Sequence, residues 1–485
     1  HLTHPTHELP QSQVFPMSTA TWPDYRAVWR WHFYAGLICL PFVIILSITG
    51  CVYLFKPQIE AWTERDYNWL QPTQTPLPPS ELIASALQAF PNSVFASYEL
   101  PADTRCAARV LLATDDGSQR VYVHPGTAAV LGSIPEDQRI MRLFFRIHGE
   151  LLMGDRGSNI VETAACWTIV LLLSGIYLWW PRSAKGLAGV LYPRLFSGSR
   201  LFWRDLHAVV GLWITGLALF LLLSGLPWAK FWGDYLKSVR QLTGTAVARQ
   251  DWSNTAERRP TNGVGPGQTA AAAAENSGHS GHGSSGKRPA GPAPDLTHID
   301  HMVAAVAALQ LDPPVIISAP GGRSKKWSGK SETANRPRRV TVDLDPATGR
   351  ILDRQNFSDR HWIDRAVGYG IAAHEGQLFG WTNTALGLLT GAGLILLSVS
   401  GAIMWWKRRD AGILGAPRIL ARPQLSAGLL GLLLLLGLCF PLFAASLCAV
   451  LLLEWLVLSR IRAVSHWLGL QPATTAAGSQ TLNPL

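Results

Sequence analysis

The stretch HEGQLFGWTNTALGLLTGAGLILLSVSGAIMWWKR, from His374 to Arg408, contains the clearest structural signal in the chain. It has no charged residue between Leu386 and Trp406, and a segment of this length can cross the ~30 Å hydrocarbon core of a bilayer. One histidine precedes the apolar segment, and two tryptophans and basic residues follow it. We therefore predict a transmembrane helix with a histidine just before its start.

The same arrangement occurs earlier, in HGELLMGDRGSNIVETAACWTIVLLLSGIYLWWPR, from His148 to Arg182. In both stretches a glycine follows the histidine by six residues, a Ser-Gly pair by 26 and 27, and a tryptophan pair by 31 and 32. A second pair of segments, WRWHFYAG with His32 and WRDLHAVVG with His207, also matches. We interpret these matches as an internal repeat. Each half contains a histidine-headed helix, a polar excursion, a second histidine and another helix.

Glycines recur at fixed distances from the first histidine of each half. Gly36 and Gly211 follow that histidine by four residues, and Gly50 and Gly225 follow it by eighteen. At ~3.6 residues per turn, eighteen residues make five turns, so Gly50 and Gly225 share the histidine's face of the helix. Gly36 and Gly211 lie one turn from it.

The composition favours a membrane protein over a water-soluble one. Of the 485 residues, 48% are hydrophobic and 15% are charged, whereas soluble domains carry about 25% charged residues. Basic residues, which give a net charge of +10, cluster beside apolar segments, so membrane orientation explains them and no nucleic-acid partner is expected. The six cysteines form no CxxC or CxxCH motif, which disfavours thioredoxin-like chemistry and covalent c-type haem.

The expected fold is a mostly α integral membrane protein, with a pseudo-two-fold repeat of transmembrane helices and two α+β domains outside the membrane. Basic loops assign the cytoplasmic side. The predicted order is a cytoplasmic N-terminus (1–30), a first span (31–56), a first outer domain (57–138), an interfacial helix and second span (139–182), a cytoplasmic loop (183–205), a third span (206–228), a second outer domain (229–360) with a disordered insert (254–294), an interfacial helix and fourth span (361–408), a cytoplasmic loop (409–424), an apolar hairpin broken by Pro441 (425–459) and a tail (460–485).

Each outer excursion shows a helical pattern, then alternating apolar segments, then a second amphipathic segment that carries a histidine. In the first excursion we predict a helix over 80–90, strands over 94–100, 107–114 and 120–124, and a surface helix over 138–152. In the second we predict a helix over 296–309, strands over 315–318 and 339–344, and a helical segment over 357–373.

Histidine is costly inside a membrane and usually marks function there. His32 and His207 both start spans that leave the cytoplasm, and His148 and His374 both precede spans that return, so each pair shares one leaflet. Across a two-fold axis along the membrane normal each pair faces itself, and two facing imidazoles are the axial ligands of a six-coordinate haem b. Zinc is disfavoured, because two imidazoles without Cys or carboxylate partners make a poor tetrahedral set. In the alternative interpretation the four histidines cap helices or bond backbone carbonyls.

The glycines fit the haem interpretation. Gly36 and Gly211 would leave room for a flat macrocycle at the inner site, and Gly50 and Gly225 would do so at the outer site. Two haems would form an electron path across the bilayer. A bis-histidine iron has no open position, so it should pass electrons rather than bind oxygen.

The segments WRWHFYAG, FFRIHGELLMG, SGIYLWWPR, WRDLHAVVG, HEGQLFG and SGAIMWWKR, together with the turn DPATG, carry a family resemblance over about residues 25–410. The chain resembles the PepSY-associated transmembrane-helix proteins, which are bacterial inner-membrane proteins with periplasmic PepSY domains. The resemblance implies haem-ligand roles for His32, His148, His207 and His374. It also implies multi-pass insertion in the inner membrane, with both outer domains PepSY-like and periplasmic.

Several members of this family reduce ferric siderophores in the periplasm with two b-type haems, so the resemblance implies a ferric-siderophore reductase. The expected partners are a ferric siderophore, the lipid bilayer and an unidentified electron donor. No GxGxxG fingerprint for NAD or flavin is present. The alternatives are a di-haem reductase for another periplasmic acceptor, and a non-enzymatic PepSY module that binds or inhibits a partner.

Overall fold

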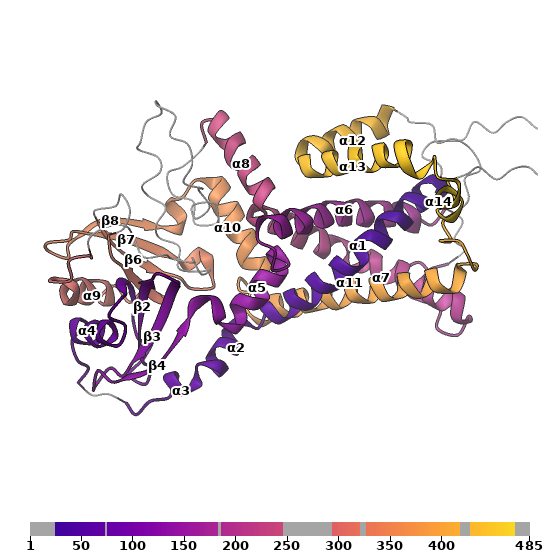
Figure 1. Cartoon of the computed structure of the whole chain (residues 1–485). Coiled ribbons are helices and arrows are strands. Elements are labelled where there is room, and N and C mark those ends of the chain that lie inside the picture. Colours follow the sequence, from indigo (N-terminus) through magenta and orange to yellow (C-terminus); the bar gives the residue numbers. More distant parts are fainter. Residues whose placement is uncertain are drawn as a thin grey trace, which may run out of the picture.

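The computed structural model describes residues 25–72, 75–182, 186–245, 293–320, 326–417 and 427–470. Figure 1 shows a bundle of long helices with a β-sheet and short helices at one end of it. Four predicted regions lie wholly or partly outside the described residues. They are the N-terminus before residue 25, the disordered insert as far as residue 292, the loop from 418 to 424, and the tail after residue 470.

Five helices among the described residues are long and apolar enough to cross a membrane. They are α1 (Tyr25–Tyr53), α6 (Asp155–Trp179), α7 (Ser199–Gly225) with the 3₁₀ turn η2 (Leu226–Trp228), α11 (Trp381–Arg408), and α13 (Pro441–Leu453) with the π-helical turn η6 (Glu454–Leu458). The protein is therefore a mostly helical membrane protein. The helices α1 and α7 begin six or seven residues before the predicted spans, because polar turns extend them beyond their apolar segments.

The helices α1, α6, α7 and α11 form the bundle, in which α11 packs against both α1 and α7, and α6 also contacts both. Two glycines of α11 allow close approach. A Cβ atom at Gly391 would collide with Cys51 of α1, and one at Gly393 would lie 2.9 Å from Ile214 of α7. Small residues bring membrane helices together in this way, because without water the contact depends on close van der Waals packing.

The C-terminal apolar region consists of α12 (Ala427–Cys439) and α13, and the chain breaks between them where Pro441 begins α13. Proline ends the first helix because it lacks an N–H and clashes with the preceding turn. The two helices pack against each other, and α13 also packs against α6 and α8, as Figure 1 shows for α12, α13 and α6. The region therefore consists of two helices that meet at Pro441, and its crossing of the membrane as a hairpin stays a prediction. The 13 residues of α12 extend only about 20 Å.

Short helices connect the bundle with the sheet. They are α2 (Lys56–Thr63), α3 (Arg65–Asn68), α5 (Ile140–Glu150), α8 (Lys230–Leu242) and α10 (Trp362–His374), and a further short helix, α14 (Arg462–Trp467), lies at the opposite end of the bundle (Figure 1). The helices α5 and α10 correspond to the two predicted histidine-bearing segments. The 3₁₀ turns η1 (Glu136–Gln138) and η5 (Phe357–Asp359) precede them. The helix α8 was not predicted.

The sheet has eight strands in the order β4-β3-β2-β1-β5-β6-β7-β8, and every neighbouring pair is antiparallel. The strands are β1 (Val94–Glu99), β2 (Ala108–Thr114), β3 (Gly117–Val123), β4 (Val130–Pro135), β5 (Val315–Ser318), β6 (Trp327–Ser331), β7 (Val340–Leu344) and β8 (Ile351–Asn356). The sequence predicted β1, β2, β3, β5 and β7, but not β4, β6 or β8.

The two polar excursions, predicted as two domains, share this one sheet. Strand β1 of the first pairs with β5 of the second, with Tyr98 opposite Ile317, and the Leu100 N–H donates to the Val315 carbonyl at 2.9 Å. The pairing covers two strand edges that would otherwise expose unpaired backbone groups. The excursions therefore form one folded unit outside the bundle.

The helices α4 (Pro79–Ala89) and α9 (Ile299–Ala307) pack on this unit and share its core. The side chains of Ile83, Val306 and Ile317 are fully buried there, and each such burial is worth about 1.5–3 kcal/mol. The backbone N–H and hydroxyl of Ser80 donate to Asp300 at 2.8 and 2.7 Å, so a polar contact also joins α4 to α9.

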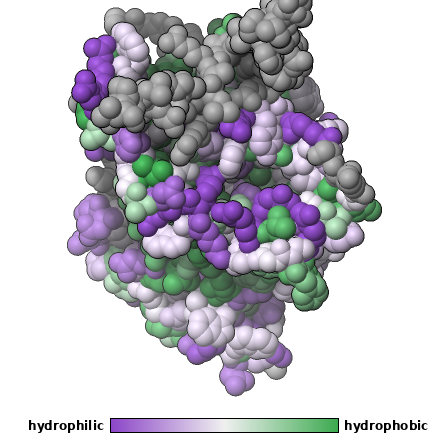
Figure 2. Space-filling view, turned by 90° about the vertical axis from the view of Figure 1, so that its right-hand side faces the viewer, coloured by the Kyte–Doolittle hydropathy of each residue, from purple (hydrophilic) through white to green (hydrophobic). Residues whose placement is uncertain are grey.

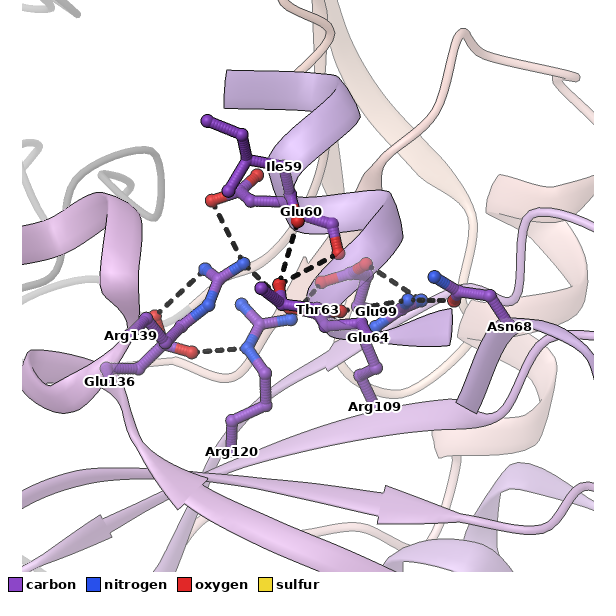
Figure 3. Close-up of polar contacts among 10 residues, drawn as sticks. All are labelled: Ile59, Glu60, Thr63, Glu64, Asn68, Glu99, Arg109, Arg120, Glu136 and Arg139. Atoms are coloured by element: carbon purple, nitrogen blue, oxygen red, sulfur yellow. Dashed lines mark hydrogen bonds and ion pairs between the residues drawn. The ribbon is translucent and has the colours of Figure 1, made fainter. Parts of the chain in front are cut away.

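A cluster of buried ion pairs connects the segment that follows α1 to the first half of the sheet (Figure 3). Glu64, between α2 and α3, lies 2.9 Å from Arg139 and 3.2 Å from Arg109. Arg120 of β3 lies 2.6 Å from Glu99 of β1. Because these charges are almost wholly buried, each depends on its partners, and loss of one would leave a buried charge uncompensated.

Candidate functional site

The structure brings the two outer histidines together. His148 is near the end of α5 and His374 is the last residue of α10. Their ring centroids are 6.4 Å apart with an interplanar angle of 78°. After each histidine the chain reverses into a span through a glycine of positive φ, Gly154 or Gly380, each at 60°. Glycine adopts this backbone conformation at little cost, which explains why a glycine recurs six residues after each histidine.

The inner histidines also face each other. His32 lies near the start of α1 and His207 near the start of α7. Their ring centroids are 6.4 Å apart with an interplanar angle of 89°. The two sites therefore have the same separation, and each takes one imidazole from each half of the chain.

Each imidazole has a hydroxyl partner on a neighbouring helix. The Nδ1 atom lies 2.8–3.0 Å from a Ser or Thr oxygen in all four cases. The pairs are His32 with Ser174, His148 with Thr49, His207 with Ser400 and His374 with Ser224.

These hydroxyls also determine the tautomer of the rings. Each lies within hydrogen-bonding distance of a carbonyl of its own helix, at 2.8 Å for Thr49, 3.1 Å for Ser174, 2.7 Å for Ser224 and 3.1 Å for Ser400. With its proton donated to that carbonyl, the hydroxyl oxygen accepts from the Nδ1–H of the imidazole. The Nε2 atom of each ring then keeps its lone pair. Metal-binding histidines are oriented in the same way, by a hydrogen bond from the other ring nitrogen.

Glycines beside these hydroxyls leave room for the imidazole rings. A Cβ atom at Gly50 or Gly225 would lie 3.2 Å from Cε1 of His148 or His374, respectively. The predicted role of these two glycines was to admit the macrocycle, but their nearest neighbours are the histidines themselves. At the inner site, a Cβ atom at Gly175 would lie 3.4 Å from Cε1 of His32, and one at Gly401 would lie 3.5 Å from Cε1 of His207.

The four hydroxyls and the glycines Gly175 and Gly401 were not predicted as part of the site. The sequence did contain a signal for them, since each of the four bundle helices has a Ser-Gly or Thr-Gly pair where it contacts a histidine ring. The pairs are Thr49-Gly50, Ser174-Gly175, Ser224-Gly225 and Ser400-Gly401.

Both histidine pairs line cavities. The outer cavity measures about 240 Å³ and is lined by His148, His374, Gly50 and Gly225 among others. The side chain of Trp228 lies beside His374, with ring centroids 6.4 Å apart. The adjacent Glu375 lies 3.7 Å from the buried Arg336, so its carboxylate has a cationic neighbour within the protein.

The inner cavity measures about 1360 Å³ and is lined by His32, His207, Gly36 and Gly211 among others. The side chains nearest to a Cβ atom at Gly36 or Gly211 would be Leu171 at 3.7 Å or Leu397 at 3.6 Å. These are ordinary contacts. Gly36 and Gly211 therefore lie on the wall of the inner cavity, and their role beside a macrocycle stays a prediction.

Three residues line both cavities. Val43 of α1, Thr168 of α6 and Leu394 of α11 appear in the walls of each. The inner and outer cavities are thus separated by a thin layer of side chains near the middle of the bundle.

The residues present fit a bis-imidazole metal centre such as haem. A metal–nitrogen bond of about 2 Å on each side, with each ring centroid about 1 Å further back, gives a centroid separation of about 6 Å, near the 6.4 Å observed in both pairs. Within the part of the chain that the structure describes, no group of three or more His, Cys, Asp or Glu side chains could hold a metal ion. The donor set at each site is two imidazoles.

The fold and the paired sites define a helical membrane protein with two matched histidine centres inside one bundle. The family model for the PepSY-associated TM region matches residues 29–408. The chain therefore belongs to the PepSY-associated transmembrane family, as the sequence motifs predicted. A comparison with curated proteins finds no match.

Proposed function

We propose that the protein carries electrons across the bacterial inner membrane through two b-type haems and reduces ferric siderophores in the periplasm. The observation that carries this proposal is the matched pair of centres. In each, two partly buried imidazoles lie opposite each other, with Nδ1 within 2.8–3.0 Å of a hydroxyl oxygen, which leaves Nε2 available for a metal. We further propose that the two halves are related by a pseudo-two-fold axis along the membrane normal.

In this proposal His32 and His207 hold the cytoplasmic-side haem, and His148 and His374 hold the periplasmic-side haem. A haem supplies an iron that exchanges one electron at a time without binding oxygen when both axial positions are occupied. The protein orients the imidazoles through the Ser and Thr hydroxyls and leaves space for the rings at the glycines. The mostly apolar wall of the outer cavity limits the access of water to that site.

The expected terminal step is transfer of one electron to a chelated ferric ion, which becomes ferrous and binds its chelator weakly. The eight-stranded sheet with α4 and α9 is the PepSY-like unit in this proposal and lies in the periplasm. The outer site is at the end of the bundle nearest that unit, because α5 and α10 lead directly from β4 and β8 into it.

The first prediction concerns the purified, full-length protein. A pyridine haemochrome assay should give two haems b per chain, and His148→Ala should lower the ratio to one while the inner haem keeps its spectrum. The physical reason is that each pair is separate and loses its iron when one of two axial ligands is removed.

A colourless wild-type preparation would contradict the haem proposal, and so would loss of both haems from a folded His148→Ala protein. The acceptor is tested separately, by anaerobic reoxidation of the reduced protein with ferric siderophores, cupric ion and disulfides. Selective reoxidation by the ferric chelates supports the proposed activity, whereas preference for either other acceptor would contradict it.

A further inference from the structure

The inner and outer cavities differ greatly in size although their histidine pairs match. The inner cavity, at about 1360 Å³, is more than five times the outer one, at about 240 Å³. If both hold the same prosthetic group, as the proposed function requires, the inner cavity has space for a second molecule. That space lies toward the end of the bundle remote from the sheet, because its lining includes the loop after α6 and the last residues of α11.

The lining of the inner cavity is strongly basic. It contains six cationic residues, Arg182, Arg194, Arg200, Arg204, Lys407 and Arg408, and no aspartate or glutamate. Asp205, just behind this wall, pairs with Arg194 at 2.6 Å and Arg204 at 2.7 Å. Figure 2 views the molecule from this end and shows hydrophilic residues gathered there beside hydrophobic ones. Two haem propionates would balance only part of this charge.

Five tryptophans also line the inner cavity, namely Trp29, Trp179, Trp180, Trp203 and Trp405. The Nε1–H of Trp179 donates to the Val190 carbonyl at 3.0 Å, and that of Trp405 donates to the Leu414 carbonyl at 2.8 Å. These two indoles are therefore held in place by the loops that follow α6 and α11. Fixed aromatic rings favour a planar aromatic ligand, and arginines favour phosphate, which they bind through paired N–H donors.

We propose that the inner cavity binds the electron donor, a planar aromatic reductant that carries a phosphate, and specifically reduced flavin mononucleotide. This inference rests on the proposed function. The phosphate would pair with the arginines, and the ring system would pack among the indoles beside the inner haem. A flavin suits the site better than a nicotinamide, because a six-coordinate haem accepts single electrons whereas a nicotinamide transfers hydride.

The electron balance is complete with the donor named. One reduced flavin anion loses two electrons and one proton to become oxidised flavin. Two ferric haem irons each gain one electron to become ferrous, in two successive steps. The proton leaves to water at the open end of the cavity.

Binding is tested first, without electron transfer, on the purified full-length protein. Oxidised flavin mononucleotide should bind with quenching of its fluorescence by the indoles, and riboflavin, which lacks the phosphate, should bind at least tenfold more weakly. The Arg200→Gln variant should weaken flavin mononucleotide binding about 10- to 100-fold and leave riboflavin binding unchanged. Arg462→Gln is the matched control, since Arg462 begins α14 at the same end of the bundle, is exposed and does not line the cavity.

Electron transfer is tested second, by anaerobic stopped-flow absorbance of the haem bands. Reduced flavin mononucleotide should reduce the haems at least tenfold faster than reduced riboflavin at equal concentration, and reduced nicotinamide dinucleotide alone should not reduce them. Equal binding of the two flavins, equal effects of Arg200→Gln and Arg462→Gln, or direct reduction by the nicotinamide would overturn the inference. If the protein contains two haems but neither binds flavin nor is reduced by it, only this inference is refuted. If the protein contains no haem, the proposed function is refuted.

Discussion

At the scale of single residues, the site is defined by the hydrogen-bond partner of the Nδ1 atom of each imidazole. A neutral histidine presents one donor and one acceptor, and which nitrogen is which depends on its neighbours. Here the hydroxyl at Thr49, Ser174, Ser224 or Ser400 makes Nδ1 the donor. The Nδ1 atom of His207 also lies 3.1 Å from the Leu397 carbonyl, to which the Ser400 hydroxyl donates. This hydrogen-bond relay, from Nδ1–H to hydroxyl to carbonyl, leaves Nε2 without a proton, as the metal-ligand interpretation requires.

The substitution Thr49→Val tests the relay, because valine has nearly the shape of threonine but no hydroxyl. His148 would then lose the acceptor for its Nδ1–H. We expect the outer haem to remain but to bind about 10- to 100-fold more weakly, measured by the rate of haem transfer to apomyoglobin. Thr163→Val is the matched control, since the Thr163 hydroxyl also donates to its own helix, at 2.8 Å, and has no histidine partner in the part of the chain that the structure describes. Equal haem loss from both variants would refute the relay.

The glycines give a steric test at the same scale. In Gly50→Ala the new Cβ atom would lie 3.2 Å from Cε1 of His148, so the ring must shift from its position opposite His374. We expect outer-haem occupancy to fall while the inner haem stays, as measured by haem stoichiometry and low-temperature absorbance.

Gly216→Ala, within α7, serves as the control because no atom lies within 4 Å of its Cβ position. It should keep both haems and stabilise the helix by about 0.5–1 kcal/mol. If Gly50→Ala kept full outer-haem occupancy, the proposed steric role of Gly50 would be wrong.

At the scale of helices and strands, the sequence predicted most of what carries the site. The apolar segments gave the four bundle helices, and the equal spacing of histidines and glycines in the two halves gave the two pairs. The helix α5 was predictable because its apolar positions have helical spacing. The strands β4, β6 and β8 were missed, since residues such as Gly132, Gly329 and Asp353 interrupt the apolar alternation that marks a half-buried strand.

The ion-pair cluster of Figure 3 should make the outer unit sensitive to acid. Burial alone would raise the pKa of Glu64, but attraction by Arg139 and Arg109 outweighs burial and lowers that pKa below its ordinary value of 4.5. The pKa of Glu136 is lowered in the same way, with Arg120 as the main counter-charge. A lowered folded-state pKa means that the stabilisation is fully present above pH 4.5 and is lost as the pH falls through the folded-state value.

We therefore expect the thermal unfolding temperature of the outer unit to fall steeply below pH 4.5, as followed by circular dichroism of the full-length protein. Glu64→Gln should lower stability at neutral pH and flatten the acid dependence, because one of the titrating carboxylates is gone. Glu81→Gln, at an exposed position of α4, should leave the profile unchanged. An unchanged acid profile in Glu64→Gln would show that this cluster does not control it.

At the scale of the whole molecule, the largest feature that the sequence did not predict is the junction of the two excursions. Each excursion has its own helix and strands, so each looked like a separate domain. The pairing of β1 with β5 joins residues more than 200 positions apart, and no local periodicity records such a contact. The same holds for the polar contact between Ser80 and Asp300.

If electrons pass through the two histidine centres in series, reductant on one side of the membrane should reduce ferric chelate on the other side. In proteoliposomes of uniform orientation, with reductant enclosed on the inner-histidine side and ferric chelate on the other, ferrous iron should form outside only when both haems are present. His32→Ala, which breaks the inner pair, should lower this rate at least a hundredfold while chemically reduced outer haem still reacts with the chelate. Full transmembrane rate in His32→Ala would exclude a series path.

The continuous sheet limits how far the two halves of the protein can move relative to each other. A carrier that alternately opens to the two sides of a membrane must let its halves rock against each other. Here backbone hydrogen bonds between β1 and β5 tie the halves together outside the bundle, while glycine contacts of α11 hold them closely packed inside it. A stationary frame of this kind suits cargo that needs no opening at all, and the electron is such a cargo.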